Sequence, residues 1–485
     1  MKEKTKHTKI KSLSKTTIKK EEKKMTETPD EPLSPTGRLF MQPSSDEVIN
    51  CVVAGENPIA LDSLKSEISN SLMLKHPRFC SLMLRDGRGR EHWRRTAVDV
   101  DRHLVVLRAR LAGADDDEAV SGYVAGLASS SPLAADKPLW EIHVLAAHNA
   151  VVFRVHHALG DGVSLLSLLL THCRRADDPA RLPTVGGSRA SAASASALLT
   201  RRGWGVWEFV KVVWFTIFYV VEFVLRVAWL SDRRTVVSGG SGVELWPRRL
   251  ATARFRLADM KIVKRAVPDS TINDVLFGII SSGLSRYLDM RESKALRNGI
   301  QITGIAMVNL RPHTGLQELS QLMTGDPGSR WGNKFGVILL PVYYHGSESD
   351  PLEFVKRSKA MIDKKKLSLE APFSYKLMDS IISLLGPKLA SMLKYRLLCN
   401  TTFTVSNVVG PQEEITLAGN PVKYIRPTSS SLPHAITMHM MSYAGIADMQ
   451  ILVAKDVIPD PRVLANCFQD ALLELKAAAE AALKS

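Results

Sequence analysis

The hydrophobic and polar positions of the chain follow strand-like and helix-like periods in two separate halves. The first half predicts a helix at 61–74, a strand at 98–107, a hairpin of strands within 142–155 that turns at His148 and Asn149, and a helix at 163–170. The second half predicts strands at 253–257, 300–309, 335–344, 402–406, 436–442 and 449–454, and helices at 272–288, 352–364, 375–398 and 461–483. This mixture predicts an α/β fold of two sandwich-like domains with a cleft between them.

The segment 204–230 is almost wholly apolar and is interrupted only by Glu208, Lys211, Glu222 and Arg226. On a helix that turns 100° per residue, these four side chains fall within a stripe roughly 60° wide, and Glu222 and Arg226 are spaced to pair with each other. Arginines beside both ends and tryptophans near them are typical of membrane contact. We therefore expect a membrane-associated helix at 204–230, and whether it spans the bilayer or lies in its interface stays open. Burial between the domains is the alternative without a membrane.

The charge of the chain is concentrated at its beginning. The formal net charge is +15 over 485 residues, and residues 1–24 hold ten lysines against three glutamates. Such a stretch buries too little apolar surface to fold alone, so we expect a disordered lysine-rich tail at 1–30 that either attracts anionic lipid or is simply solvated. It has no apolar core of a signal peptide, and no recognised motif supports nucleic-acid binding. Five scattered cysteines favour a reducing compartment and argue against disulfides and metal sites.

Composition also divides the chain. Residues 174–200 are rich in serine, alanine, arginine and proline, which is typical of a linker, and serine and glycine at 238–242 mark a second break. The sequence therefore predicts an N-terminal domain at 31–173, a linker with the membrane-associated helix at 174–240, and a C-terminal domain at 241–485.

The most informative run is 156–162, between the predicted hairpin and the helix that follows it. It contains His156, His157 and Asp161, together with Gly160 and Gly162, which permit backbone angles that a Cβ would forbid. Imidazole exchanges a proton near neutrality, and a histidine at a strand end is held in one direction. Taken singly, His156 is as consistent with a structural role and Asp161 with capping of the helix, but the combination favours a catalytic function.

This run resembles the HHxxxDG signature of acyltransferases with the chloramphenicol acetyltransferase-like fold, which act on acyl-CoA or on carrier-bound acyl groups. Other short runs stand in a fixed order around it: EPLSP at 31–35, PLW at 138–140, ND at 273–274 and SNVVGP at 406–411. From about residue 31 onward, the chain is similar to the plant wax ester synthase/diacylglycerol acyltransferase family. The resemblance implies two chloramphenicol acetyltransferase-like domains that join acyl-CoA to a long-chain fatty alcohol or to diacylglycerol.

The resemblance also implies roles for single residues. His157 is the general base, with His156 and Asp161 beside it, and Gly162 supports the motif. Apart from the resemblance, we expect Asp161 to hold the loop by pairing with an arginine, and Arg311, which follows a predicted strand, is the candidate partner. The remaining residues implied to lie near the cleft or the substrate channel are Asn273, Asp274, Asn407, Pro138, Leu139 and Trp140. Capping explains Asn273 and Asp274 equally well, turn chemistry explains Asn407, and core packing explains Trp140. The loop 332–336 gains interest from the resemblance alone.

No metal or bound cofactor is implied, because acyl-CoA is a substrate, and no nucleophile elbow of the G-x-S-x-G type occurs. The endoplasmic reticulum membrane with the catalytic domains facing the cytosol is expected, and the plasma membrane is the alternative location. Two other functions stay open: a carrier-dependent condensation enzyme and a catalytically silent membrane-bound homologue. His156 and Asp161 also satisfy the H-x-x-x-x-D pair of glycerolipid acyltransferases of another fold, but the glycine-rich acidic phosphate-binding motif of that class does not follow them. Wax ester synthesis with weaker triacylglycerol formation is the favoured activity.

Overall fold

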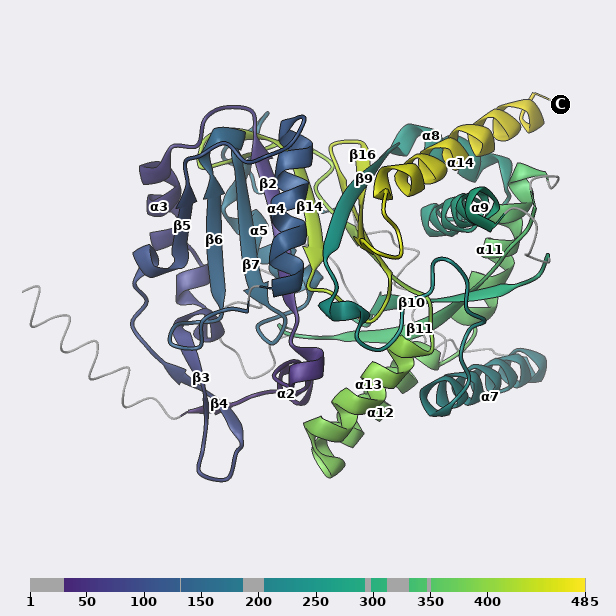
Figure 1. The fold of residues 1–485 in the computed structure, drawn as a ribbon, viewed down its shortest axis with the longest axis horizontal. Coiled ribbons are helices and arrows are strands. Elements are labelled where there is room, and N and C mark those ends of the chain that lie inside the picture. The colour runs from purple at the N-terminus through teal and green to yellow at the C-terminus, as the bar shows by residue number, and fades with distance from the viewer. Residues whose placement is uncertain are drawn as a thin grey trace, which may run out of the picture.

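The computed structural model describes residues 30–130, 132–185, 205–292, 298–311, 331–346 and 350–484. The expected lysine-rich tail lies outside these residues, apart from Asp30, and so does most of the linker. The described chain is an α/β structure with two large sheets, which Figure 1 shows side by side.

The first large sheet has seven strands in the order β5-β6-β7-β2-β14-β13-β8. They are β5 (Leu104–Leu107), β6 (Trp140–Leu145), β7 (Ala150–His156), β2 (Val48–Gly55), β14 (Asn420–Ser429), β13 (Ile415–Leu417) and β8 (Cys173–Arg175). β13 and β14 come from the second half of the chain, and β14 pairs antiparallel with β2. The two halves are therefore joined by strand pairing as well as by the chain. A small sheet of β1 (Glu31–Pro32), β4 (Glu91–Arg95) and β3 (Ser81–Arg85) lies beside it.

The second large sheet has six strands in the order β11-β10-β12-β15-β16-β9. They are β11 (Phe335–Tyr343), β10 (Gln301–Asn309), β12 (Phe403–Val409), β15 (Ile436–Tyr443), β16 (Ile446–Ala454) and β9 (Arg248–Arg256). β12 runs parallel to both of its neighbours, β10 and β15, so their corresponding ends meet at one edge. The ends of β10 and β12 lie at the cavity described below.

Helices cover both sheets. Those of the first half are α2 (Pro35–Phe40), α3 (Leu61–Ser69), α4 (Asp116–Ser130) and α5 (Gly162–Thr171). Those that pack on the second sheet into its largest core are α8 (Leu257–Ala266), α9 (Ile272–Glu292), α11 (Pro351–Lys366) and α14 (Pro461–Ala482). At Gly283 of α9 a Cβ would lie only 2.3 Å from Cδ1 of Phe468, so α9 and α14 approach closely because this residue is glycine.

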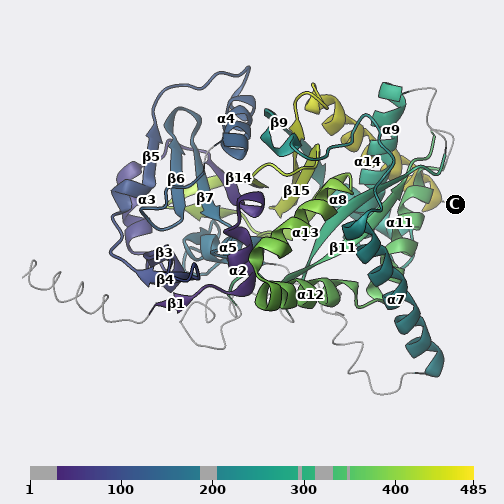
Figure 2. The same cartoon turned by 60° about the horizontal axis from the view of Figure 1, so that its bottom comes forward.

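Three further helices lie along the lower side of the molecule in Figure 1 and come forward in Figure 2: α7 (Val206–Ala228), α12 (Glu370–Leu385) and α13 (Pro387–Cys399). α7 occupies the segment expected to be a membrane-associated helix. In the described part of the chain, no helix combines the length and the apolarity needed to cross a bilayer.

The charged stripe of α7 meets the protein in its second half. Arg226 is buried and binds Asp232 at 2.6 Å, and Glu222 lies 3.9 Å from Nζ of Lys365. The predicted pairing of Glu222 with Arg226 is therefore wrong, because each finds a partner outside the helix. The apolar side chains of the opposite face are exposed: Val206, Trp207, Phe209, Val210, Trp214, Ile217, Phe218, Val221 and Val224. α7 is thus not buried between the domains, and it presents its apolar face outward.

The predicted hairpin is present as β6 and β7, and its turn ends at Asn149 in the left-handed region. The strand predicted at 98–107 is wrong in its first half, because Asp99 accepts a hydrogen bond from the backbone of Asp101 and starts a helical turn there. The helix predicted at 61–74 ends at Ser69, where the side chain of Asn70 turns back to the carbonyl of Ser66. β2, β14 and α4 were not predicted.

Candidate active site

An apolar cavity of about 280 Å³ lies between the two halves of the molecule. Phe40, Phe153 and Leu166 contribute to its wall from the first half, and Ile305 and Met440 contribute from the second. Such a space accepts hydrocarbon chains and excludes water from charged intermediates. His157, Asp161, Gly162, Arg311 and Asn407 all lie on its wall, so the fold brings together five of the predicted site residues.

His157 follows the last residue of β7, and its backbone N–H donates to the carbonyl of Glu47 at 2.8 Å. The imidazole stacks on Phe40 with ring centroids 4.1 Å apart. Its Nδ1 lies 3.0 Å from Oδ1 of Asn333, and Nδ2 of Asn333 donates to the carbonyl of His157 at 2.8 Å. Because this second bond fixes which side of the amide faces the ring, Nδ1 must carry the proton. Among the described residues Nε2 has no hydrogen-bond partner, so its lone pair is free.

His156 is buried, and both nitrogens of its ring are occupied. Nδ1 accepts from the backbone N–H of Ala158 at 3.1 Å, and Nε2 lies 2.9 Å from Oδ1 of Asp46. The ring of His156 therefore stabilises the loop, and the adjacent imidazole of His157 is the one that lines the cavity.

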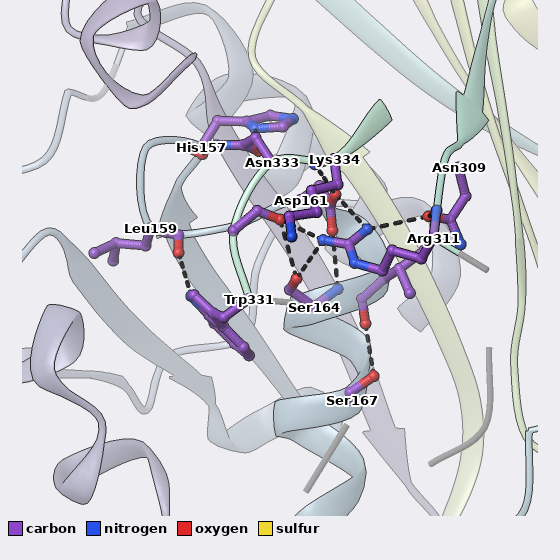
Figure 3. A network of polar contacts seen from close by, with 12 residues as sticks. His157, Leu159, Asp161, Ser164, Ser167, Asn309, Arg311, Trp331, Asn333 and Lys334 are labelled. Carbon is purple, nitrogen blue, oxygen red and sulfur yellow. Dashed lines mark hydrogen bonds and ion pairs between the residues drawn. The ribbon is translucent and has the colours of Figure 1, made fainter. Parts of the chain in front are cut away.

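Asp161 performs both tasks that the sequence suggested for it. Its Oδ1 accepts from the backbone N–H of Ser164 at 3.0 Å and so caps α5. Its Oδ2 lies 2.8 Å from Nη1 of Arg311, and both side chains are almost fully buried. The predicted pairing is therefore present, and Figure 3 shows the arginine reaching from the end of β10 to the start of α5. A second bond from Arg311 to Oγ of Ser164, at 3.0 Å, ties the two halves together beside His157.

The reason expected for the two glycines is wrong, because neither Gly160 nor Gly162 adopts a positive φ. At Gly160 a Cβ would lie 3.3 Å from Cζ2 of Trp331, whose indole N–H donates to the carbonyl of Leu159 at 2.7 Å. Gly160 therefore leaves room for the tryptophan that holds the loop. Gly162 is the first residue of α5 and leaves the cavity wall open, facing Val408.

The remaining predicted residues lie in supporting positions. Leu139 and Trp140 are buried in the core of the first half, and the indole of Trp140 donates to the carbonyl of Phe79, which itself lines the cavity. Pro138 directly precedes them in the turn that enters β6. Asn407 donates to Oδ1 of Asn273 at 2.8 Å, which connects β12 to the start of α9.

Asp274 is fully buried at the start of α9. Its Oδ2 accepts from the backbone N–H of Thr271 at 2.6 Å and from the hydroxyl of the same residue at 2.8 Å. The contacts of this carboxylate thus belong to the beginning of the helix, which agrees with the capping interpretation.

Sequence reasoning missed four residues that surround His157: Asn333, Glu47, Lys394 and His439. Glu47 forms an ion pair with Lys394, whose Nζ lies 4.8 Å from the ring centre of Phe40. Asn333 stood in a loop that only the family resemblance singled out, and the other three belong to no motif. Within the described residues, no group of three His, Cys, Asp or Glu side chains could hold a metal ion.

The electrostatics of the cavity keep His157 neutral. Burial lowers the pKa of His157, and the positive charge of Lys394 adds to this, while the carboxylates of Glu47 and Asp161 oppose it. Burial acts to raise the pKa of Glu47, but Lys394 and His157 outweigh it, so Glu47 is ionised. A neutral imidazole with a free Nε2, beside an apolar cavity, can accept a proton from a hydroxyl group.

Comparison with known proteins identifies the family. The family model of the wax ester synthase/diacylglycerol acyltransferase catalytic domain matches residues 53–276, and that of the WS/DGAT C-terminal domain matches residues 331–476. Wax ester synthase/diacylglycerol acyltransferases 11 and 5 of Arabidopsis thaliana are 36% and 35% identical to this chain. The alignments cover 93% and 96% of this chain, and 95% and 96% of the two relatives. The chain belongs to the wax ester synthase/diacylglycerol acyltransferase family. It is accordingly an acyltransferase.

Solved structures agree with the family in their fold. A wax ester synthase/diacylglycerol acyltransferase from Marinobacter aquaeolei VT8 has a TM-score of 0.58 at 17% identity, with 93% of this chain and 100% of that chain covered. The trichothecene 15-O-acetyltransferase of Fusarium sporotrichioides has a TM-score of 0.57 at 12% identity, with 93% and 94% covered. At these identities the likeness shows the shared fold alone, and it confirms the two-domain α/β architecture expected for this family.

Proposed function

We propose that this acyltransferase uses His157 as a general base to esterify a long-chain fatty alcohol with the acyl group of acyl-CoA, and that it also forms triacylglycerol from diacylglycerol. The single observation that carries the proposal is the free Nε2 of a neutral, tautomer-fixed His157 at the wall of an apolar cavity. The family supplies the class of reaction, and the apolar cavity walls suit hydrocarbon chains.

This geometry supports a reaction in two steps. Nε2 of His157 takes the hydroxyl proton of the alcohol as its oxygen forms a bond to the thioester carbonyl carbon. The carbon–sulfur bond then breaks, and the proton passes from Nε2 to the sulfur of CoA. Asn333 retains its contact with the Nδ1–H throughout and stabilises the imidazolium. No acyl-enzyme forms, and acyl-CoA and the alcohol are the only reactants, with no metal or bound cofactor.

Substituting His157 by alanine tests the base. We expect His157→Ala to lose ester synthesis by about 10²–10⁴-fold, the range that general base catalysis supplies, while its thermal unfolding and its membrane association stay as in the parent protein. His156→Ala is the matched comparison: it removes the neighbouring imidazole and the contacts with Asp46 and Ala158, so its main effect is on stability. Ester synthesis at the parental rate in a folded His157→Ala protein would exclude His157 as the base.

The preferred acceptor is proposed from the same cavity. We favour the long-chain alcohol as the main acceptor and diacylglycerol as the weaker one, because a single hydrocarbon chain needs less width than two. Competition between the two acceptors in membranes that contain the protein decides the order, and dominant triacylglycerol would reverse it. Turnover of free acyl-CoA in the same assay separates the enzyme from a carrier-dependent condensation enzyme, and absence of any turnover would favour a silent homologue.

Membrane lipid is the proposed partner of the outward face of α7. Trp207 is 69% exposed and Trp214 is 66% exposed, while Arg226 and Glu222 hold the opposite face to the protein. The end of α12 adds Leu384, which is 82% exposed, and Leu385, which is 66% exposed. The helices α7 and α12 lie on the same side of the molecule in Figure 1. An apolar face of this size with tryptophans is typical of a helix that lies in a membrane interface.

Lipid vesicles test this contact. We expect the protein to float with vesicles of neutral and anionic phospholipid, and the triple variant Trp207→Ser, Trp214→Ser, Phe218→Ser to remain in the soluble fraction. Leu473→Ser is the control, because Leu473 is 60% exposed on α14, and α14 lies on the side of the molecule opposite to α7 in Figure 1. Equal flotation of the triple variant would exclude α7 as the contact.

We propose the endoplasmic reticulum membrane as the location of the protein, with the cavity reached from the cytosol. The plasma membrane is the alternative location.

A further inference from the structure

His439 is a second imidazole on the wall of the cavity, and it comes from the other half of the molecule. It lies on β15, where its backbone is paired with Ser406 of β12 on one side and with Gln450 of β16 on the other. His157, by contrast, follows β7 of the first large sheet. The two rings therefore belong to two different sheets, and both line the space that separates them.

The ring of His439 has unused hydrogen-bonding capacity. Its Nδ1 is fully buried and lacks a partner, and among the described residues no hydrogen bond to either ring nitrogen is present. The hydroxyl of Thr428, also on the cavity wall, is buried and likewise has no partner in the described part of the chain. Buried polar groups in folded proteins are almost always paired. Two such groups in one cavity wall leave hydrogen-bonding capacity unsatisfied beside the space where we place the reactants.

The charge state of His439 allows it to act as a hydrogen-bond donor. Burial lowers the pKa of His439 to about 4, and the nearby His157 adds to this effect, while Glu47 opposes it. The ring is therefore neutral near pH 7, and a neutral imidazole has one N–H to donate. His157 already takes the proton of the alcohol in the proposed mechanism, so a second base is not needed. What that mechanism lacks is a donor for the thioester oxygen.

We propose that His439 donates a hydrogen bond to the thioester carbonyl oxygen and stabilises the negative charge that this oxygen gains when the alcohol attacks. The inference rests on the proposed function of His157 and adds the oxyanion donor to it. In the tetrahedral intermediate the former carbonyl oxygen carries the charge, and the alcohol proton is on Nε2 of His157. When the intermediate collapses, the carbonyl re-forms, CoA leaves as a thiol with that proton, and His439 ends the cycle with the N–H it began with.

The test uses the complete protein and compares the fatty alcohol with water as the acceptor of the acyl group. His439→Phe keeps an aromatic ring of similar shape and removes the donor, whereas His439→Gln keeps an N–H. We expect His439→Phe to lower kcat for ester synthesis by about 10²–10³-fold, as does the loss of one oxyanion donor elsewhere, with a small change in the KM of the alcohol and with part of the rate restored in His439→Gln. Hydrolysis of acyl-CoA, in which water replaces the alcohol, should fall by the same factor.

His172→Phe is the matched control. His172 is another imidazole on the cavity wall, but its Nδ1 already lies 3.0 Å from the carbonyl of Leu168. We expect its kcat to change far less than that of His439→Phe. Both His439 variants are compared at equal folded fraction from thermal unfolding, and His439→Gln carries the test should the phenylalanine variant not fold.

Each outcome is decisive. A higher KM for the alcohol with parental kcat and parental hydrolysis would overturn the oxyanion role and assign His439 to the acceptor hydroxyl. Parental kcat and KM in both variants would exclude any role. If the parent protein turns over acyl-CoA and His157→Ala does not, while His439→Phe is as active as the parent, this inference fails and the proposed function stands. If the parent protein does not transfer the acyl group at all, both the proposed function and this inference fail.

Discussion

Oδ1 of Asn333 lies 3.0 Å from Nδ1 of His157, and the same asparagine binds the backbone carbonyl of His157 through its amide nitrogen. The two residues are 176 positions apart. One amide therefore decides which nitrogen of the histidine is protonated and also holds its backbone. A carboxylate at this position would orient the ring equally well, but it would also raise the basicity of the ring.

This relationship predicts the pH dependence of catalysis. Burial lowers the pKa of His157 from the ordinary 6.5, so the neutral base persists to lower pH and the acid limb of kcat/KM should lie below that value. In Asn333→Asp the added negative charge should raise the pKa of His157 and move the acid limb to higher pH. In Glu47→Gln a charge that raises the pKa of His157 is removed, so the limb should move to lower pH. The measurement is kcat/KM against pH for the three proteins.

Opposite displacements of the limb in these two variants distinguish an electrostatic effect on His157 from general damage to the site. Loss of activity at all pH values without displacement would mean that another group sets the acid limb.

The buried ion pair of Asp161 and Arg311 predicts strong coupling between the two halves. Arg311→Met leaves a buried carboxylate without its cation, which should reduce the free energy of unfolding by about 3–5 kcal/mol. The double variant Asp161→Asn, Arg311→Met removes both charges, so it should be less destabilised than the sum of the two single variants. Denaturant unfolding of all four proteins gives the coupling energy, and simple additivity would contradict a direct interaction. We expect activity to fall in each variant, because His157 lies four residues before the carboxylate.

Lys365 predicts how α7 is attached. Its ammonium binds the buried Glu370 at 2.8 Å, lies 3.9 Å from Glu222 and stands 3.6 Å from the ring centre of Tyr219. Lys365→Met should therefore loosen α7, which contributes two of these three contacts, by leaving two carboxylates without a cation. Limited proteolysis should cut near α7 sooner than in the parent protein. Lys356→Met is the control, because among the described residues Lys356 pairs with exposed carboxylates of its own helix and its N-cap. Equal cutting in both variants would exclude this attachment.

The sequence predicted elements well where a segment has one clear period, and it could not predict contacts that depend on sheet order. The hairpin of β6 and β7 and most strands of the second sheet follow from alternation along a short run. β14 reads like other strands, but nothing in its residues indicates that it joins the sheet of the first half beside β2. The positions of Glu47 and His439 depend on such crossings, so local patterns could not place them near His157.

The residues of the site also divide into those that the sequence could place and those that it could not. The pair of Asp161 and Arg311 could be proposed because each carries a charge that burial must neutralise and each stands at the end of an element. Asn333 is uncharged and lies in a loop. It does not need an opposite charge when it is buried, so the sequence does not indicate its partner. For α7, the helical period of the sequence predicted that its charged residues form one stripe. Whether the stripe faces solvent or protein depends on residues far away in the chain, because Lys365 and Asp232 bind its last two members, Glu222 and Arg226.

A buried histidine far from the reaction predicts how the fold responds to acid. Burial lowers the pKa of His434 to about 3 from 6.5, and its two nitrogens lie 2.9 Å from the hydroxyl of Thr401 and 2.8 Å from that of Thr404. Because the unfolded chain takes up a proton near pH 6.5 and the folded one does so only near pH 3, the contribution of His434 to stability is complete above pH 6.5 and is lost as the pH falls between these values. Thermal unfolding across this range should show a decreasing Tm. His434→Gln keeps a donor and an acceptor for the two hydroxyl groups but has no proton to gain, so its Tm should decrease less steeply than that of the parent, although it starts lower. Parallel decreases in the two proteins would mean that other groups, such as His172, whose pKa burial lowers to about 4, account for the sensitivity to acid.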